Sequence, residues 1–387
     1  MCLPEMVRAA MDAEIEIVAG VSHADPQEWD AFTDGSPLLS HAFLSALEET
    51  GCVGAGTGWQ PYSLLVRNTG KLVGAMPLYV KSHSYGEYVF DWAWANAYER
   101  SDMAYYPKLL CAIPFTPITG ARLLSADIET KTLMLQVVIQ QMEQHQLSSA
   151  HVLFPDDASA EVLKKAGWLE RRGVQFRWEN ENFRDFEDFL SRLSHDKRKK
   201  IHQERKKIVN AGVVCKKFKG NDVTAEQWDF FFKCYENTYY QHRSTPYLTR
   251  EFFHALGVRM PQHVMLIIAE QAGEPIAAAF NIYGDDALYG RYWGTLRYVP
   301  GLHFELCYYQ AQEFCIAQGI RYFEGGAQGE HKLSRGFLPR LTRSFHKIAH
   351  PDFEAAIKNF VEHEAKGMNV YQNELEERAP FKHIEDL

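Results

Sequence analysis

Four chemically active side chains lie close together at the end of a glycine-rich segment, Gly325–Pro339. Glu330, His331, Lys332 and Arg335 follow three glycines that are placed within five residues. Glycine lets a backbone approach a ligand closely. Ordering a polar, glycine-rich loop costs conformational entropy, so such a loop is seldom kept only for packing. The residue types predict proton transfer by an acid or a histidine, and binding of a phosphate or carboxylate by the two cations.

The residues beside this loop extend the candidate site. Glu324 ends the strand expected over 320–324, next to the glycine turn. Two alternatives stay open: Glu324 would form an ion pair with Arg321 or Arg291 across a sheet, and His331 would bond to backbone. We predict three catalytic candidates: Glu324, Glu330 and His331. We predict four substrate contacts in this half of the chain: Arg291, Trp293, Lys332 and Arg335.

A second candidate group surrounds Asp91, which lies in an aromatic stretch that we expect to form a strand over 88–94. A carboxylate among aromatic side chains needs either a raised pKa or a firm partner. One interpretation is a pocket for an acceptor substrate, and the alternative is an aromatic core. The predicted substrate contacts in this half are Asp91, Trp94, Tyr105, Tyr106 and Lys108.

A run of seven cations lies on an expected helix over 183–210. Such a face either contacts a polyanion, such as tRNA or an anionic membrane, or is simply solvated. The predicted contacts to a donor phosphate or tRNA are Lys197, Lys199, Lys200 and Arg205.

Composition limits what these groups can serve. The chain has 387 residues, is 46% hydrophobic and 13% aromatic, and carries a net charge of −9. These values predict about two globular domains and argue against general nucleic-acid binding. We expect no signal peptide and no bilayer-spanning run, and seven scattered cysteines fit a reducing cytoplasm. No metal-binding motif is found, so we expect no metal.

The elements that must position these residues repeat along the chain. Each half is expected to contain a strand, a helix pair, a three-strand meander, a long helix and a further strand. The short helices begin at good caps, such as Ser40 for a helix over 40–49. In the second half we expect a helix over 302–318, closed by Gly319, and a strand over 341–349. We predict domains at 12–182 and 183–387.

This order of elements resembles that of the GNAT acyltransferase superfamily. The blocks Gly319–Gly326 and Lys332-Leu-Ser-Arg-Gly-Phe337 resemble the FemABX type of tandem GNAT acyltransferase. Blocks such as Asp91–Asn96, Tyr105–Lys108 and Pro114–Pro117 are similar to those of uncharacterised FemAB-like predicted N-acyltransferases. The resemblance implies an α/β fold of two GNAT-like domains with mixed, mostly antiparallel sheets, and a peptidoglycan-related role.

The resemblance also implies a function. An N-acyltransferase would move an acyl or aminoacyl group from acyl-CoA or aminoacyl-tRNA to a primary amine, in a cleft between the domains. One departure bears on the donor: the expected pyrophosphate loop reads Arg297-Tyr-Val-Pro-Gly-Leu302, and its proline has no N–H for a phosphate. The alternative is a non-catalytic metabolite-binding or scaffold protein on the same fold. The oligomeric state does not follow from the sequence.

Overall fold

The computed structural model describes residues 13–326 and 329–382. Two compact units are present, the first comprising Met1–Gly173 with Thr342–Asn369 and the second Val174–Leu341 with Val370–Leu387. The sequence-predicted domains, 12–182 and 183–387, differ from these units in one main respect. The segment 342–369 groups with the first unit, although it follows the second along the chain.

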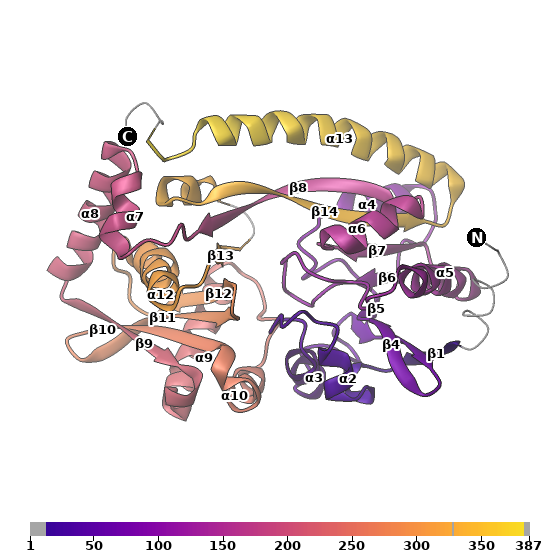
Figure 1. The fold of residues 1–387 in the computed structure, drawn as a ribbon, viewed down its shortest axis with the longest axis horizontal. Helices are drawn as coiled ribbons and strands as arrows, with labels where there is room; N and C mark the ends of the chain where they lie inside the picture. The colour runs from indigo at the N-terminus through magenta and orange to yellow at the C-terminus, as the bar shows by residue number, and fades with distance from the viewer. Residues whose placement is uncertain (1–12, 327–328, 383–387) are drawn as a thin grey trace. The chain divides into compact units, whose positions relative to one another are not determined.

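The first unit contains two sheets (Figure 1). One has the order β1-β3-β4, and the other has the order β2-β5-β6-β7-β14, in which β6 and β7 run parallel. Its strands are β1 (Ala13–Val18), β2 (Trp59–Pro61), β3 (Ser63–Asn68), β4 (Lys71–Met76), β5 (Leu78–Lys81), β6 (Lys108–Cys111), β7 (Ser149–Leu153) and β14 (Leu338–Ile348). Its helices are α2 (Pro26–Asp30), α3 (His41–Glu49), α4 (Trp92–Arg100), α5 (Ile128–Gln144), α6 (Asp157–Lys165) and the first part of α13 (Pro351–Glu377).

Local signals in the first unit act as expected. The Ser40 side chain accepts a hydrogen bond from the Phe43 N–H and caps α3, as predicted. Asp127 caps α5 in the same manner, and this helix buries Met134, Val138 and other apolar residues against the sheet. The core of the unit therefore lies between α5 and strands β3, β4, β6 and β7.

The strands of the second unit follow the order β8-β13-β12-β11-β10-β9, in which β12 and β13 run parallel. Its strands are β8 (Leu169–Glu179), which begins in the first unit, β9 (Val213–Lys219), β10 (Val264–Gln271), β11 (Glu274–Tyr283), β12 (Ala287–Thr295) and β13 (Tyr322–Glu324). Its helices are α7 (Phe186–Arg192), α8 (His195–Asn210), α9 (Ala225–Gln241), α10 (Arg250–Arg259), α11 (Leu302–Phe304), the π-helix η4 (Glu305–Tyr309), α12 (Gln310–Gln318) and the 3₁₀-helix η5 (Glu330–Arg335).

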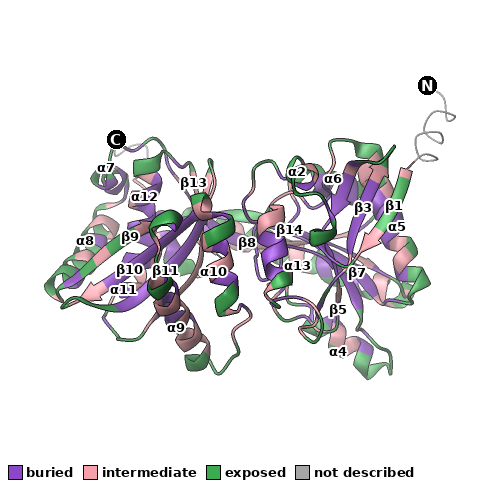
Figure 2. Cartoon of the chain, turned by 90° about the horizontal axis from the view of Figure 1, so that it is seen from below, coloured by how far each residue is buried: buried purple, intermediate pink, exposed green. Residues whose placement is uncertain are grey.

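Burial in the second unit follows its central strands. Strands β10 and β11 are buried along most of their length, as Figure 2 shows. Helices α7, α8 and α12 pack on one face and contribute to a single apolar cluster with β10, β11 and β13. The sheet is mixed and mostly antiparallel in both units, so the predicted fold class is confirmed at this level.

Three local predictions change in the structure. The strand expected over 88–94 is absent, because α4 begins at Trp92 and buries Trp94 and Tyr98, which lie four residues apart on one helical face. The helix expected over 183–210 is divided into α7 and α8, with Leu193 in an extended conformation between them. The helix expected over 302–318 contains the π-helix η4, while its closure by left-handed Gly319 is confirmed. The strand expected over 341–349 is confirmed as part of β14.

Candidate functional site

The first candidate site lies where strands β12 and β13 of the second unit part. The two strands pair only from Ala287 with Tyr322 to Tyr289 with Glu324, and β12 then continues to Thr295. Gly290 is the first residue of β12 beyond this pairing. A Cβ atom at Gly290 would come 3.3 Å from the Phe323 ring, so the close packing there favours glycine. The strand edge beyond it is therefore not covered by β13.

A β-bulge lies on β12 at the same point. Phe280 pairs with Tyr292 and Asn281 pairs with Gly290, so Arg291 is the extra residue on β12. A bulge changes the direction in which a side chain leaves a strand. The Arg291 guanidinium donates a hydrogen bond to the Tyr292 hydroxyl at 3.3 Å. The predicted substrate contact Arg291 is thus held at the junction of β12 and β13.

Glu324 is the last residue of β13, and its carboxylate forms an ion pair with Arg177 at 3.7 Å. The sequence alternatives Arg321 and Arg291 are not this partner. Burial raises the pKa of Glu324 above its usual value, while the charges of Arg177, Arg340 and Lys332 oppose that shift. A carboxyl group with a raised pKa is better suited to exchange protons near neutral pH than an exposed one.

Lys332 is the cation of this site. It lies in η5 with 2% of its surface exposed, and its Nζ donates a hydrogen bond to the Gly326 carbonyl oxygen at 2.7 Å. Burial lowers the pKa of Lys332 to about 8, although the Glu324 carboxylate and the Cys307 thiol favour the charged form. The glycine turn and η5 thus bring Lys332 close enough to Glu324 for each charge to affect the other's titration. Ala327 and Gln328 of the same loop lie outside the described residues.

His331 belongs to an aromatic row beside this pair. Its Nε2 is 2.9 Å from the Tyr308 hydroxyl, and Tyr308 is carried by the π-helix η4. Burial lowers the pKa of His331, with further lowering by Arg335 and Lys332. His303 lies between the rings of Trp293 and Tyr308, at 4.6 and 5.5 Å between ring centroids, and burial lowers its pKa to about 4. The π-helix η4, which carries Tyr308, interrupts the helix expected over 302–318, and such π-helical interruptions are frequent at functional sites.

Arg335 has a different environment from the one that a substrate contact needs. Its guanidinium is 2% exposed and donates to both carboxylate oxygens of Glu204 at 3.0 Å. A third hydrogen bond joins Arg335 to the His331 carbonyl oxygen at 2.7 Å, and the guanidinium stacks 3.4 Å from the Phe304 ring centroid. Its charge is already compensated. The geometry favours Arg335 as the anchor that holds η5 against α8 and α11.

Glu330 points to another part of the unit. Its carboxylate accepts hydrogen bonds from Arg378 at 2.7 Å and from the Tyr371 hydroxyl at 3.0 Å. The hydrogen bond from Arg378, followed by that from Tyr371, lowers the pKa of Glu330. Because Glu330 is exposed and firmly ionised, it is a weaker candidate for a general base than Glu324.

The predicted phosphate contacts on α8 divide into two groups. Lys199 lines a depression of about 310 Å³ on the exposed face of the helix, together with Arg198 and Lys206. Lys200 is also exposed, and Lys197 is partly so. Arg205 instead forms ion pairs with Glu305 at 3.1 Å and Glu313 at 2.7 Å. The structure thus leaves the three lysines available to solvent and uses Arg205 to fix α8 to η4 and α12.

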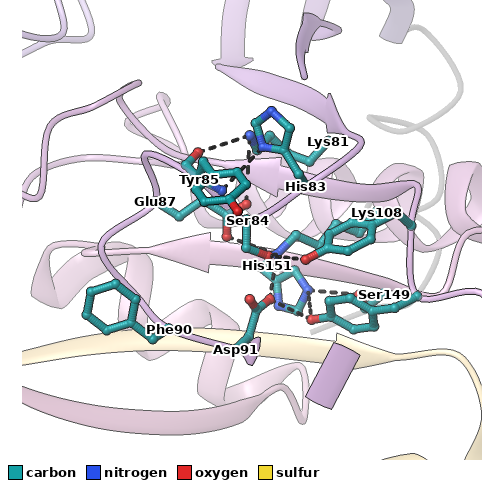
Figure 3. A network of polar contacts seen from close by, with 12 residues as sticks. Lys81, His83, Ser84, Tyr85, Glu87, Phe90, Asp91, Lys108, Ser149 and His151 are labelled. Carbon is teal, nitrogen blue, oxygen red and sulfur yellow. Dashed lines mark hydrogen bonds and ion pairs between the residues drawn. The ribbon is translucent and has the colours of Figure 1, made fainter. Parts of the chain in front are cut away.

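The second candidate group is a buried polar network in the first unit (Figure 3). The register of β5 and β6 places Lys81 directly opposite Lys108, and both side chains are 0% exposed. Two ammonium groups on facing positions of a buried sheet repel each other and lose hydration. They therefore require carboxylates from a neighbouring segment, and the loop between β5 and α4 supplies them.

Lys108 lies at the centre of this network. Its Nζ donates to Asp91 Oδ2 at 2.5 Å, to Glu87 Oε2 at 2.9 Å and to Ser84 Oγ at 2.9 Å. Burial opposes the charge on Lys108, but Glu87 and Asp91 outweigh it and the pKa is raised. Burial raises the pKa of Glu87 to about 7 and lowers that of Lys81 to about 7. For Asp91 burial is outweighed by Lys108, and the pKa is lowered.

The network continues through Tyr105 to two histidines. The Tyr105 hydroxyl donates to Asp91 Oδ2 at 2.7 Å and lies 3.2 Å from His151 Nε2. The register of β7 and β14 places His346 opposite His151, and their Nδ1 atoms are 2.6 Å apart. Burial lowers the pKa of both imidazoles well below the usual value, so both are neutral and only one Nδ1 carries a proton. The Ser149 hydroxyl lies 2.8 Å from His151 Nε2 and the Ser344 hydroxyl lies 2.9 Å from His346 Nε2, so every ring nitrogen of the pair has a polar neighbour.

The other predicted members of this group take their places around it. The Tyr106 hydroxyl is hydrogen-bonded to Ser84 at 2.8 Å. The Trp94 ring lies 4.8 Å from the His346 ring and 5.3 Å from the Arg171 guanidinium, within an apolar cluster on α4. The structure therefore brings Asp91, Tyr105, Tyr106 and Lys108 together, in an environment closed to solvent rather than in an open pocket.

Sequence reasoning missed several members of the network. Lys81, Glu87, His151 and His346 are all buried and charged or polar. The available signal was a polar residue beside apolar strand residues: Lys81 ends the strand Leu78–Lys81, and His151 lies in the middle of Ser149–Leu153. No local pattern indicates that these strands lie beside each other, because the pairing depends on the sheet order.

Two other kinds of feature are absent from the part of the chain that the structure describes. No helix within residues 13–326 and 329–382 is long and apolar enough to cross a membrane. Within the same described ranges, no group of three or more histidine, cysteine, aspartate or glutamate side chains is arranged to hold a metal.

Comparison with known proteins gives the fold and the family. The crystal structure of FemX is 12% identical, with a TM-score of 0.54, covering 89% of this chain and 100% of that chain. L-PGS from Bacillus licheniformis is 8% identical, with a TM-score of 0.53, covering 87% of this chain and 97% of that chain. A tandem GNAT protein from the clavulanic acid biosynthesis pathway is 10% identical, with a TM-score of 0.46, covering 88% and 99%. No curated protein sequence matches this chain.

The likeness to FemX shows the fold, since identity is too low to transfer function. The chain has the α/β fold of FemX, with the mixed, mostly antiparallel sheets expected from the sequence. Residues 20–383 match the model of the FemAB-like family, which is described as acting in peptidoglycan biosynthesis or recognition. The chain therefore belongs to the FemAB-like family.

Proposed function

We propose that this protein is an N-acyltransferase that moves an acyl or aminoacyl group from a thioester or from aminoacyl-tRNA to a primary amine. Membership of the FemAB-like family and the tandem GNAT-like fold support an acyltransferase-type function. The observation that carries the proposal is that Glu324 and Lys332, beside the uncovered edge of β12, are close enough for each charge to affect the pKa of the other. Burial moves both pKa values toward neutrality, as proton transfer at neutral pH requires.

The reaction requires three tasks. The acceptor amine must lose a proton, the oxyanion of the tetrahedral intermediate must be stabilised, and the leaving group must be protonated. Glu324 takes the proton from the acceptor ammonium. The amine nitrogen then attacks the carbonyl carbon, a C–N bond forms, and the C–S or C–O bond to the donor breaks.

Lys332 performs the other two tasks. With a pKa of about 8 it is mostly protonated at neutral pH, so its N–H groups stabilise a developing oxyanion. The same pKa makes Lys332 a stronger acid than an exposed lysine, so it can give a proton to the departing thiolate or alkoxide. After its attack on the carbonyl, the amine nitrogen must lose a second proton to become an amide. Lys332 gives one proton to the departing thiolate or alkoxide and takes up this second proton from the nitrogen, so the lysine ends the reaction protonated.

The residues near this pair would hold the substrates. Arg291 at the bulge, Trp293 on β12 and His331 beside Tyr308 surround the junction where acceptor and acyl group must meet. The exposed lysines on α8, Lys197, Lys199 and Lys200, would contact phosphates of the donor. Both acyl-CoA and aminoacyl-tRNA carry such phosphates.

The first test separates the two donors. Thermal unfolding is followed during titration with CoA, acyl-CoAs and charged tRNA, because a ligand at 100 times its dissociation constant adds ~2.7 kcal/mol of stability. A donor that raises the melting temperature is then incubated with amines, and product is measured for the parent protein and Glu324→Gln.

The expected result is transfer by the parent and a loss of about 100-fold or more in Glu324→Gln. Glu181→Gln, at an exposed carboxylate of the same unit, is the matched control and should retain the parent rate. Equal rates for Glu324→Gln and Glu181→Gln would refute the assigned base. Failure of every donor to bind would favour the non-catalytic alternative.

A further inference from the structure

One end of the second unit gathers three separate chain segments. These are the end of α8 with the turn into β9, the hairpin between β10 and β11, and the loop after β12. Gln271 Nε2 donates to the Ala211 carbonyl oxygen at 2.8 Å, and Arg297 Nη1 donates to Gln271 Oε1 at 3.1 Å. These hydrogen bonds connect all three segments, so residues at their tips belong to one surface.

Large apolar side chains are exposed on this surface. The exposed fractions are 82% for Tyr298, 72% for Val209, 57% for Val214 and 51% for Leu296. We name these four residues the apolar tip. Single exposed apolar residues are ordinary, but four on neighbouring segments of one end indicate a surface that something else covers.

Cations accompany the apolar tip. Lys206 and Lys207 are exposed in the last turns of α8, and exposed Arg297 lies between Leu296 and Tyr298 in the chain. Two acids are nearby: Glu270 is paired with Lys216 at 2.7 Å, and Glu274 is exposed in the hairpin. The surface therefore combines uncovered apolar groups with an excess of positive charge.

We propose that the apolar tip and its cations form a docking surface for an anionic lipid bilayer. Lipid phosphates attract Lys206, Lys207 and Arg297, and the interfacial layer beneath them accepts aliphatic and tyrosine side chains. Double-helical RNA would satisfy only the cations, because its phosphate backbone offers nothing apolar to Val209 or Leu296. The apolar tip thus favours a bilayer over RNA as the occupant of this end of the unit.

The proposal is independent of the acyl-transfer chemistry. It uses no residue assigned to catalysis, and Val209, Val214 and Leu296 lie outside the expected donor contacts. Arg297 and Tyr298 begin the expected pyrophosphate loop, and Lys206 lines the same depression as Lys199, so donor binding is measured beside vesicle binding for every variant.

The test is co-sedimentation of the full-length protein with vesicles. One set contains equal amounts of phosphatidylglycerol and phosphatidylcholine, and the other contains phosphatidylcholine alone. Four proteins are compared: the parent, Lys206→Glu/Lys207→Glu, Val209→Ser/Tyr298→Ser, and the control Val258→Ser. Val258 is 80% exposed on α10, whose end lies near Gly220 at the opposite end of β9 from the tip.

The parent and the Val258→Ser control should bind the anionic vesicles and leave the phosphatidylcholine vesicles unbound. Each double variant should bind the anionic vesicles at least about tenfold more weakly, because cations and apolar side chains both contribute. Thermal unfolding checks that both variants are folded. Salt should weaken the binding of the serine variant most, because its remaining attraction is electrostatic.

Three outcomes would overturn the proposal. The parent does not bind anionic vesicles, it binds both vesicle types equally, or Val209→Ser/Tyr298→Ser binds as tightly as the parent. If Val209→Ser/Tyr298→Ser binds as tightly as the parent, the contact is purely electrostatic, as expected for a polyanion such as RNA. A titration of the same proteins with tRNA then tests whether RNA is that polyanion.

Discussion

Two buried lysines in this protein have opposite acid–base properties. Lys108 in the first unit contacts two carboxylates and a hydroxyl, and its pKa is raised. Lys332 in the second unit donates to a backbone carbonyl oxygen, and its pKa falls to about 8. Burial acts on both in the same direction, so the partners decide the outcome. The comparison suggests a structural role for Lys108 and a chemical role for Lys332.

The largest expected effect tests the structural role. Lys108→Met leaves Glu87 and Asp91 buried without their shared cation, which should lower the free energy of unfolding by about 3–5 kcal/mol. Urea denaturation measures this loss. Lys164→Met, at an exposed lysine of α6 in the same unit, should change little. Similar small effects for both variants would mean that the network adds no stability.

Lys332→Met should have the reverse pattern. Loss of the proposed oxyanion donor should lower kcat by about 100-fold or more, while the free energy of unfolding stays the same or rises. Steady-state kinetics with the donor identified by thermal titration, together with urea denaturation, provide both values. A variant that unfolds readily but keeps its kcat would assign Lys332 to the structural class with Lys108.

The pH dependence of stability sharpens the same contrast. The unfolded chain binds a proton at Lys332 up to about pH 10.5, whereas the folded protein releases it at about pH 8. Between these values the unfolded state binds more protons, so this group makes the free energy of unfolding rise with pH by at most about 3 kcal/mol. Urea denaturation at several pH values should show this rise in the parent and not in Lys332→Met. Identical profiles would mean that Lys332 titrates normally.

The smallest effect concerns the extension of the first network. Tyr105→Phe removes the hydrogen bond to Asp91 but leaves Lys108 in place, so the free energy of unfolding should fall by about 1–2 kcal/mol. Its loss should be smaller than that of Lys108→Met. If Tyr105→Phe loses as much free energy of unfolding as Lys108→Met, or more, the histidine pair contributes as much to stability as Lys108 does. The stability of a His151→Gln variant would then be measured.

The two sites also differ in how far the sequence revealed them. Lys332 and Glu324 lie eight residues apart around a glycine turn, so a local pattern was enough to group them. Asp91 and Lys108 lie 17 residues apart and were grouped through the aromatic residues between them. Lys81, His151 and His346 join Lys108 only through the pairing of β5, β6, β7 and β14, which no local pattern encodes.

The fold was predictable from the order of elements, and its interruptions were not. Aromatic residues favoured a strand over 88–94, but the burial of Trp94 and Tyr98 on one face imposes α4. The ion-pair partners of Arg335 and Arg205 also could not be predicted from the sequence. Both arginines have acid partners that lie at least a hundred residues away, Glu204 and Glu305.

The way the chain is shared between the units has a consequence for its synthesis. The first unit needs 342–369, which the ribosome makes only after the main part of the second unit. Strand β14, whose His346 pairs with His151, cannot join its sheet until then. During synthesis the sheet of the first unit therefore lacks β14 until roughly the last tenth of the chain is made, after most of the second unit. Truncation before residue 342 should consequently yield an incomplete first unit rather than an independent domain.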